Sequence, residues 1–156
     1  MNLPLTVVLQ IAQGIECKGI DVYRQMKDRF GDPLLDLLIE QEQAHIRVFH
    51  DLFEMSKTGP LANGLETTNL DADYLAAAYA NVEVFGQVDP NQVLPQGLFA
   101  LAVSMEKESI RFYLELLEEL PERCPDQRTL VRRLANEERQ HLRTLLARRD
   151  LFAGGQ

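Results

Sequence analysis

Glu42-Gln43-Ala44-His45 and Glu138-Arg139-Gln140-His141 are two copies of one short motif, Glu-x-x-His, on segments almost a hundred residues apart. On an α-helix, residues three apart lie about 60° apart around the axis and on adjacent turns, so both side chains can reach one point beside the helix. A single Glu-x-x-His is common on solvated helix faces. Two copies, each in phase with an apolar stripe, indicate that both pairs face the interior of a helical bundle.

The stretches around these two motifs carry the period of an α-helix. Four such segments are predicted, over residues 5–29, 33–57, 96–120 and 126–150. Asp32 and Asp126 stand where a side chain can cap the start of the second and fourth segments. Strand signals are nearly absent, so the sequence predicts an all-α protein.

The connections between the four segments predict their topology. Short links join the first to the second and the third to the fourth, so each pair is expected to form an antiparallel hairpin. Residues 58–95 make a long crossover between the hairpins, and residues 71–85 inside it are predicted to form a short helix. The prediction is therefore one domain over residues 1–156, a four-helix bundle of two hairpins.

The two hairpins are related by an internal repeat. Glu16 and Tyr23 on the first segment match Glu106 and Tyr113 on the third, with an isoleucine at the same offset in each, Ile20 and Ile110. The two Glu-x-x-His motifs match each other in the same way. A site on the resulting pseudo-twofold axis would receive the same side chains from both halves.

Four carboxylates and two imidazoles inside a bundle predict a metal site. Burying them without partners would cost more free energy than a domain has to spare. Two divalent cations would balance four negative charges, and this arrangement of helices is typical of di-iron and di-manganese carboxylate proteins. The predicted ligands of two metal ions are Glu16, Glu42, His45, Glu106, Glu138 and His141.

Tyr23 and Tyr113 lie two turns beyond Glu16 and Glu106 on nearly the same line. Two interpretations stay open for them. They either donate hydrogen bonds to ligand carboxylates of the opposite hairpin, or pack in the core with a convenient hydroxyl.

Composition excludes several classes of protein. The net charge is −8, which argues against a nucleic-acid binder or a binder of anionic membranes. No apolar run approaches a membrane span, and the N-terminus lacks a signal-peptide pattern, so a cytoplasmic protein is expected. The arginine-rich fourth segment fits a solvated face, and less simply a surface for RNA or an acidic partner.

At these residues the sequence resembles the rubrerythrin family of the ferritin-like superfamily. The resemblance covers nearly the whole chain and rests on Glu-x₆-Tyr in the first and third segments, Glu-x-x-His in the second and fourth, and the long crossover. The segment LFALAVSMEKESIRFYLEL (residues 98–116) is especially similar. The resemblance implies a ferritin-like bundle, a non-haem di-iron site on the six residues named above, oxidation of Fe(II) by hydrogen peroxide or dioxygen, and a homodimer.

Two departures from the family pattern bear on function. Typical rubrerythrins carry Glu-x-x-Glu on the third helix, whereas Ser109 stands in the position of the second carboxylate here. No rubredoxin-type segment is present, so the electrons are expected from a separate donor protein. The leading hypothesis is a di-iron oxidoreductase acting on peroxide or O₂; a ferroxidase and a bundle with a structural metal are the alternatives. Manganese or zinc would also suit the ligands.

Overall fold

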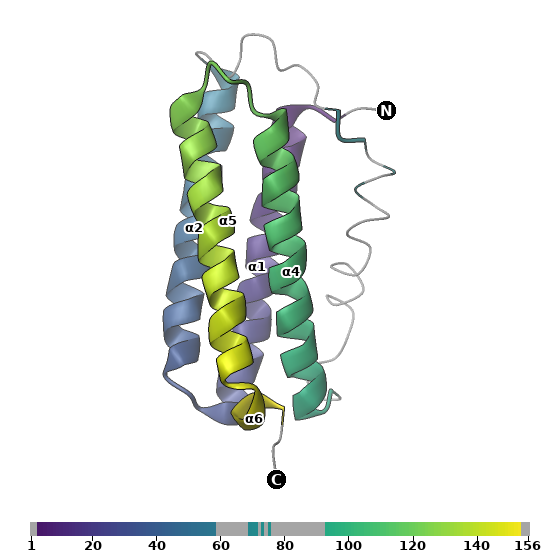
Figure 1. The fold of residues 1–156 in the computed structure, drawn as a ribbon, viewed down its shortest axis with the longest axis vertical. Coiled ribbons are helices and arrows are strands. Elements are labelled where there is room, and N and C mark those ends of the chain that lie inside the picture. The colour runs from purple at the N-terminus through teal and green to yellow at the C-terminus, as the bar shows by residue number, and fades with distance from the viewer. Residues whose placement is uncertain (1–2, 59–68, 72, 74, 76–92, 154–156) are drawn as a thin grey trace.

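The computed structural model of the chain describes residues 3–58, 69–71, 73, 75 and 93–153. Within these ranges the chain is helical, with four long helices and a short terminal one (Figure 1). Their bounds are α1 Leu5–Phe30, α2 Leu34–Lys57, α4 Pro95–Glu119, α5 Pro125–Ala147 and α6 Arg149–Phe152. All four predicted helical segments are thus confirmed, and the all-α prediction is correct.

The four long helices form two antiparallel hairpins that pack side by side (Figure 1). α1 packs chiefly on α2, α4 packs chiefly on α5, and the contact between α1 and α4 joins the hairpins. α2 ends at the end of the bundle where α1 begins, and α4 begins at the opposite end. The end of α2 and the start of α4 therefore lie at opposite ends of the bundle.

Only fragments of the connection between α2 and α4 belong to the described residues. The amide of Leu75 donates to the carbonyl of Asp71 at 3.0 Å, which closes one helical turn. The rest of the short helix predicted over residues 71–85 lies outside the described residues. In the part of the chain that the structure does describe, no helix is long and apolar enough to cross a bilayer.

The turn between α1 and α2 is fixed by two residues. Gly31 adopts a left-handed conformation, with φ 62°, and its amide donates to the carbonyl of Lys27 at 2.8 Å, which ends α1. Asp32 then accepts a hydrogen bond from the amide of Leu34 at 2.8 Å, as expected of a cap, and also pairs with Arg148. This buried carboxylate thus connects the start of α2 to the end of α5.

The start of α5 differs from the prediction. The helix begins at Pro125, and no side chain caps it. Asp126 was expected as the cap but lies inside the first turn, because proline already suits the first helical position. On the other side of this turn, at the end of α4, the guanidinium of Arg128 donates hydrogen bonds to the carbonyls of Leu117 and Leu120.

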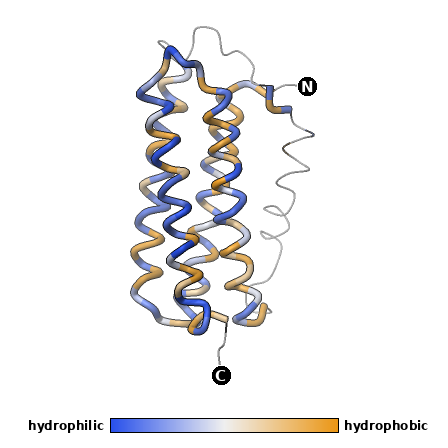
Figure 2. The backbone as a smooth tube through the Cα atoms, in the orientation of Figure 1, coloured by the Kyte–Doolittle hydropathy of each residue, from blue (hydrophilic) through white to orange (hydrophobic). Residues whose placement is uncertain are grey.

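Apolar side chains fill the bundle in two separate clusters, one toward each end, and the tube in Figure 2 shows hydrophobic and hydrophilic residues alternating along every helix. The first cluster includes Leu9, Phe49 and Leu134, and the second includes Met26, Leu38 and Leu98. A layer of buried charged residues separates the two clusters. The bundle therefore encloses a polar layer at mid-height, covered by apolar packing on both sides.

Candidate metal centre

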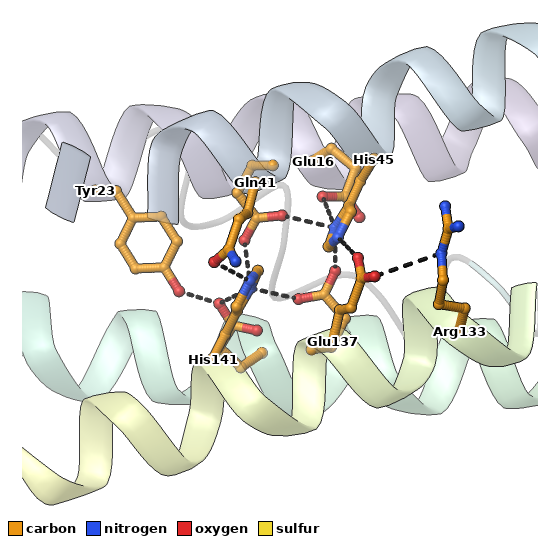
Figure 3. Close-up of polar contacts among 10 residues, drawn as sticks. Glu16, Tyr23, Gln41, His45, Arg133, Glu137 and His141 are labelled. Atoms are coloured by element: carbon orange, nitrogen blue, oxygen red, sulfur yellow. Dashed lines mark hydrogen bonds and ion pairs between the residues drawn. The ribbon is translucent and has the colours of Figure 1, made fainter. Parts of the chain in front are cut away.

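Each long helix contributes to the polar layer. Glu16 comes from α1, Glu106 from α4, and one Glu-x-x-His pair from each of α2 and α5. None of the six residues is more than 4% exposed, and Figure 3 shows Glu16, His45 and His141 pointing into the space between the helices. The structure thus brings together all six residues that the sequence nominates: Glu16, Glu42, His45, Glu106, Glu138 and His141.

The six side chains divide into two overlapping groups of possible ligands. One group contains Glu16 and His45, and the other contains Glu106 and His141. Glu42 and Glu138 belong to both groups. Within each group the ligand atoms lie within 4.8 Å of one another, a spread that a single cation could collect. The arrangement fits two metal positions that share two carboxylates.

The two shared carboxylates face both histidines with different oxygens. Nδ1 of His45 lies 3.1 Å from Oε2 of Glu42 and 2.8 Å from Oε1 of Glu138. Nδ1 of His141 lies 3.2 Å from Oε1 of Glu42 and 3.1 Å from Oε2 of Glu138. Each carboxylate therefore presents one oxygen to each position, which is what a bridging ligand must do.

The remaining carboxylates are each closer to one histidine. Oε2 of Glu16 lies 3.4 Å from Nδ1 of His45, and Oε1 of Glu106 lies 3.7 Å from Nδ1 of His141. The two imidazole rings are stacked, with centroids 5.5 Å apart and planes inclined by 14°. The histidines thus line one side of the site, from α2 and α5, and the unshared carboxylates line the other.

The outer nitrogens of the two rings have partners on the opposite hairpin (Figure 3). Nε2 of His45 donates to Glu137 at 2.9 Å, and Nε2 of His141 donates to Gln41 at 3.0 Å. Sequence reasoning missed this role, although the repeat aligns Gln41 with Glu137 immediately before the two shared glutamates. Gln41 and Glu137 each accept a hydrogen bond from a histidine of the other hairpin, so these contacts depend on how the hairpins pack together.

Several buried polar atoms in this layer lack a hydrogen bond of good geometry, even where two of them, Nδ1 of His45 and Oε1 of Glu138, meet in an ion-pair contact at 2.8 Å, and this tests whether metal ions fit. Among the described residues they include one oxygen on each of the four glutamates and Nδ1 of His45: Glu16 Oε1, Glu42 Oε2, Glu106 Oε2 and Glu138 Oε1. Buried polar atoms in native proteins are almost always paired. Oxygen and imidazole nitrogen donors left free in this way are the ligands that Fe, Mn and Zn accept. The cluster fits a dinuclear metal site.

Without metal, protons hold the cluster together. Burial, reinforced by the charges of Glu42 and Glu138, raises the pKa of the Glu16 carboxyl well above its ordinary value, and the pKa of Glu106 rises for the same reasons. Burial alone would lower the pKa of His141, but hydrogen bonds to the surrounding carboxylates outweigh it and raise that pKa to about 12. The pKa of His45 is raised in the same way.

The pKa of the shared carboxylate Glu42 shifts in the opposite direction. Burial opposes its ionisation, yet hydrogen bonds with Glu16, His141 and His45 lower its pKa below the ordinary value. The pKa of Glu138 is also lowered, because the hydrogen bonds with His141 and His45 outweigh burial and the charge of Glu42. Two carboxylates therefore stay ionised between two protonated imidazoles, and cations can replace the protons.

The two tyrosines occupy different environments. Tyr23 on α1 donates its hydroxyl to Oε1 of Glu106 on the opposite hairpin (Figure 3). Tyr113 is fully buried, packs on Phe49 with ring centroids 4.9 Å apart, and its hydroxyl has no hydrogen-bond partner within the described ranges. The repeat in sequence is therefore broken at this pair in the structure.

Comparison with known proteins agrees with this architecture. The rubrerythrin family model matches residues 98–152, which span most of α4 and all of α5 and α6. A crystal structure from Thermotoga maritima, described as that of a ferritin-like diiron-carboxylate protein, superposes with a TM-score of 0.67 at 20% identity, covering 95% of both chains. No curated protein sequence matches the chain significantly. The part of the chain from α4 to α6 is thus similar to rubrerythrins, and the chain shares the fold of a ferritin-like protein.

Proposed function

We propose that this chain is a non-haem di-iron oxidoreductase that oxidises Fe(II) with hydrogen peroxide or dioxygen. The observation that carries the proposal is the position of Glu42 and Glu138, each with one oxygen toward His45 and the other toward His141. A carboxylate with one oxygen toward each position can bridge two metals held at the short separation of a two-metal site.

Charge and burial support the proposal. The four glutamates supply four negative charges in a layer that is almost inaccessible to water, and two divalent cations would neutralise them. If these residues held two Fe(II) ions, the pair would supply the two electrons that, with two protons, reduce one hydrogen peroxide to two water molecules. The same ligand set also suits manganese or zinc, so the native metal has to be measured.

The protein's own contribution is to hold the ligands and to exclude water. The apolar clusters above and below the layer restrict solvent access, which strengthens electrostatic interactions inside it. Glu137 and Gln41 fix the orientation of the two imidazoles so that both Nδ1 atoms face inward. Tyr23 holds the carboxylate of Glu106 in place.

Several further features belong to the proposal. Electrons returning the site to the reduced state would come from a separate donor protein. The chain would act as a cytoplasmic homodimer in defence against peroxide. The homodimer and the role in peroxide defence rest on the resemblance to rubrerythrins, and all of these features are tested separately from the chemistry of the site.

One experiment distinguishes this function from its alternatives. The protein is loaded anaerobically with two equivalents of Fe(II), then mixed separately with hydrogen peroxide and with O₂, while near-UV ligand-to-metal absorption is recorded. Fast oxidation by peroxide supports the proposed oxidoreductase. Fast oxidation by O₂ alone, with turnover that follows the Fe(II) supply, indicates a ferroxidase. Two bound metals that neither oxidant changes would mean a structural site and would overturn the proposal.

A further inference from the structure

We infer that the two metal positions bind with unequal affinity, and that Glu137 and Gln41 are the positioning residues that set the difference. We call the position lined by Glu16 and His45 the His45 position, and the position lined by Glu106 and His141 the His141 position. The His45 position would hold its cation more tightly than the His141 position. The inference rests on the proposed dinuclear site.

The two positions are otherwise closely matched. Both use Glu42 and Glu138, and each adds one glutamate and one histidine of its own. The histidines meet the shared carboxylates at similar distances, between 2.8 and 3.2 Å. A difference in affinity therefore has to come from groups that contact the ligands rather than from the ligands themselves.

The partners of the two histidines differ in charge. His45 donates its Nε2 proton to the carboxylate of Glu137 at 2.9 Å, whereas His141 donates its Nε2 proton to the neutral amide oxygen of Gln41 at 3.0 Å. A negative acceptor on the outer nitrogen makes an imidazole a stronger electron donor through the inner nitrogen. His45 should consequently bind a cation more strongly than His141.

Arg133 reduces this difference only in part. Its Nε lies 3.4 Å from Oε1 of Glu137, while the contact with His45 uses Oε2. Both side chains of the arginine–glutamate pair are partly exposed, at 56% and 42%, so water screens the pairing. The contact with His45 is shorter and has one fully buried partner, so the carboxylate keeps its effect on that ring.

A second contact also weakens the His141 position relative to the His45 position. Tyr23 donates a hydrogen bond to Oε1 of Glu106, which withdraws electron density from the carboxylate that serves only the His141 position. Glu16 has no such donor: within the described ranges its Oε1 has no hydrogen-bond partner, and neither has the hydroxyl of Tyr113. The His141 position thus has both the weaker imidazole and the weaker carboxylate.

The inference is tested by anaerobic titration of the full chain with Co(II), read by calorimetry and by the visible absorption of the bound ion. The wild type should bind two Co(II) in two steps that differ about 10-fold or more in affinity, the size of effect that such outer partners have. Anomalous diffraction at one equivalent should place the ion beside His45. Glu137→Gln should weaken the first step about 10-fold, and Gln41→Glu should tighten the second.

The double variant Gln41→Glu/Glu137→Gln should bring the ion beside His141 to the higher occupancy, or at least equalise the two. Glu54→Gln is the matched control, because it removes an equal charge from an exposed pair with Lys57 outside the site and should leave both steps unchanged. Far-UV circular dichroism shows that each variant remains helical.

The titrations test the unequal affinities and the dinuclear site separately. Two equal steps in the wild type, first occupancy beside His141, or equal weakening of both steps by Glu137→Gln would overturn this inference while leaving the dinuclear site intact. Fewer than two Co(II) per wild-type chain would overturn the dinuclear site itself and the inference with it.

Discussion

Glu42 contacts both histidines through separate oxygens, whereas Glu16 contacts only His45 of the two. Glu42→Ala is therefore expected to disturb both metal positions and to lose at least one metal per chain, and Glu16→Ala should retain the metal of the other position. The measurement is metal content by elemental analysis after anaerobic Fe(II) loading and desalting. Glu40→Ala, an exposed change on the same helix, should keep two metals. Two metals retained by Glu42→Ala would contradict the assignment of this residue.

The two tyrosines provide a matched pair of single-residue variants. Tyr23→Phe removes a donor from Glu106 and leaves a buried carboxyl oxygen unpaired, which should cost about 1–2 kcal/mol of the free energy of unfolding of the metal-free protein. Tyr113→Phe removes a hydroxyl that has no hydrogen-bond partner among the described residues, so it should be neutral or slightly stabilising. Urea denaturation of both variants measures the difference. Equal losses would mean that the contact between Tyr23 and Glu106 contributes nothing specific.

At the scale of the helix, two aspartates beside prolines look alike in sequence and differ in the structure. Asp32 accepts from the amide of Leu34 and pairs with Arg148, whereas Asp126 lies within the first turn of α5 and caps nothing. Asp32→Ala should cost about 1–2 kcal/mol of the free energy of unfolding, mostly from the lost cap. Asp126→Ala loses only an interaction with the helix dipole, at most about 0.5 kcal/mol. Thermal and urea unfolding of the metal-free variants test this, and a loss as large for Asp126→Ala would refute it.

The helices and the six clustered residues could be predicted because both depend on periodicity within one segment. Each Glu-x-x-His pair faces inward for the same reason that its neighbouring apolar residues do. Helix ends were predicted less accurately, since a proline and an aspartate compete for the same boundary and the sequence alone does not rank them. The outer partners Gln41 and Glu137 could not be assigned from sequence, because each contacts a histidine of the other hairpin and the contact depends on how the hairpins dock.

Across the whole molecule, the charged layer divides the apolar core into two clusters, each of which includes residues from both hairpins. In the metal-free protein, the raised pKa values of Glu16, Glu106 and the two histidines favour their protonated forms, and the lowered pKa values of Glu42 and Glu138 favour their ionised forms. Metal binding has to displace as many as four of these protons. Stability, proton uptake and metal affinity of the bundle are therefore linked through one layer.

This linkage predicts opposite effects of pH on the two forms. The pKa values of Glu16 and Glu106 rise above the ordinary 4.5, and the pKa of His141 rises from 6.5 to about 12. The folded metal-free protein thus binds more protons than the unfolded chain over this range, so stability present at low pH is lost as pH rises. Its Tm should fall between pH 5 and about pH 9, while metal affinity and the gain in Tm on metal loading should increase.

Circular dichroism melting of metal-free and Co(II)-loaded protein across this range measures both trends, and calorimetry in buffers of different ionisation enthalpy counts the protons released. His50→Ala is the control, because His50 is exposed on the same helix as His45 and its loss should leave both slopes unchanged. The physical reason is that a cation displaces protons from the side chains that bind it, and His50 is not one of these side chains. A metal-free Tm that rises from pH 5 to pH 8, or metal binding without proton release, would show that the buried layer is not held together by protons in the absence of metal.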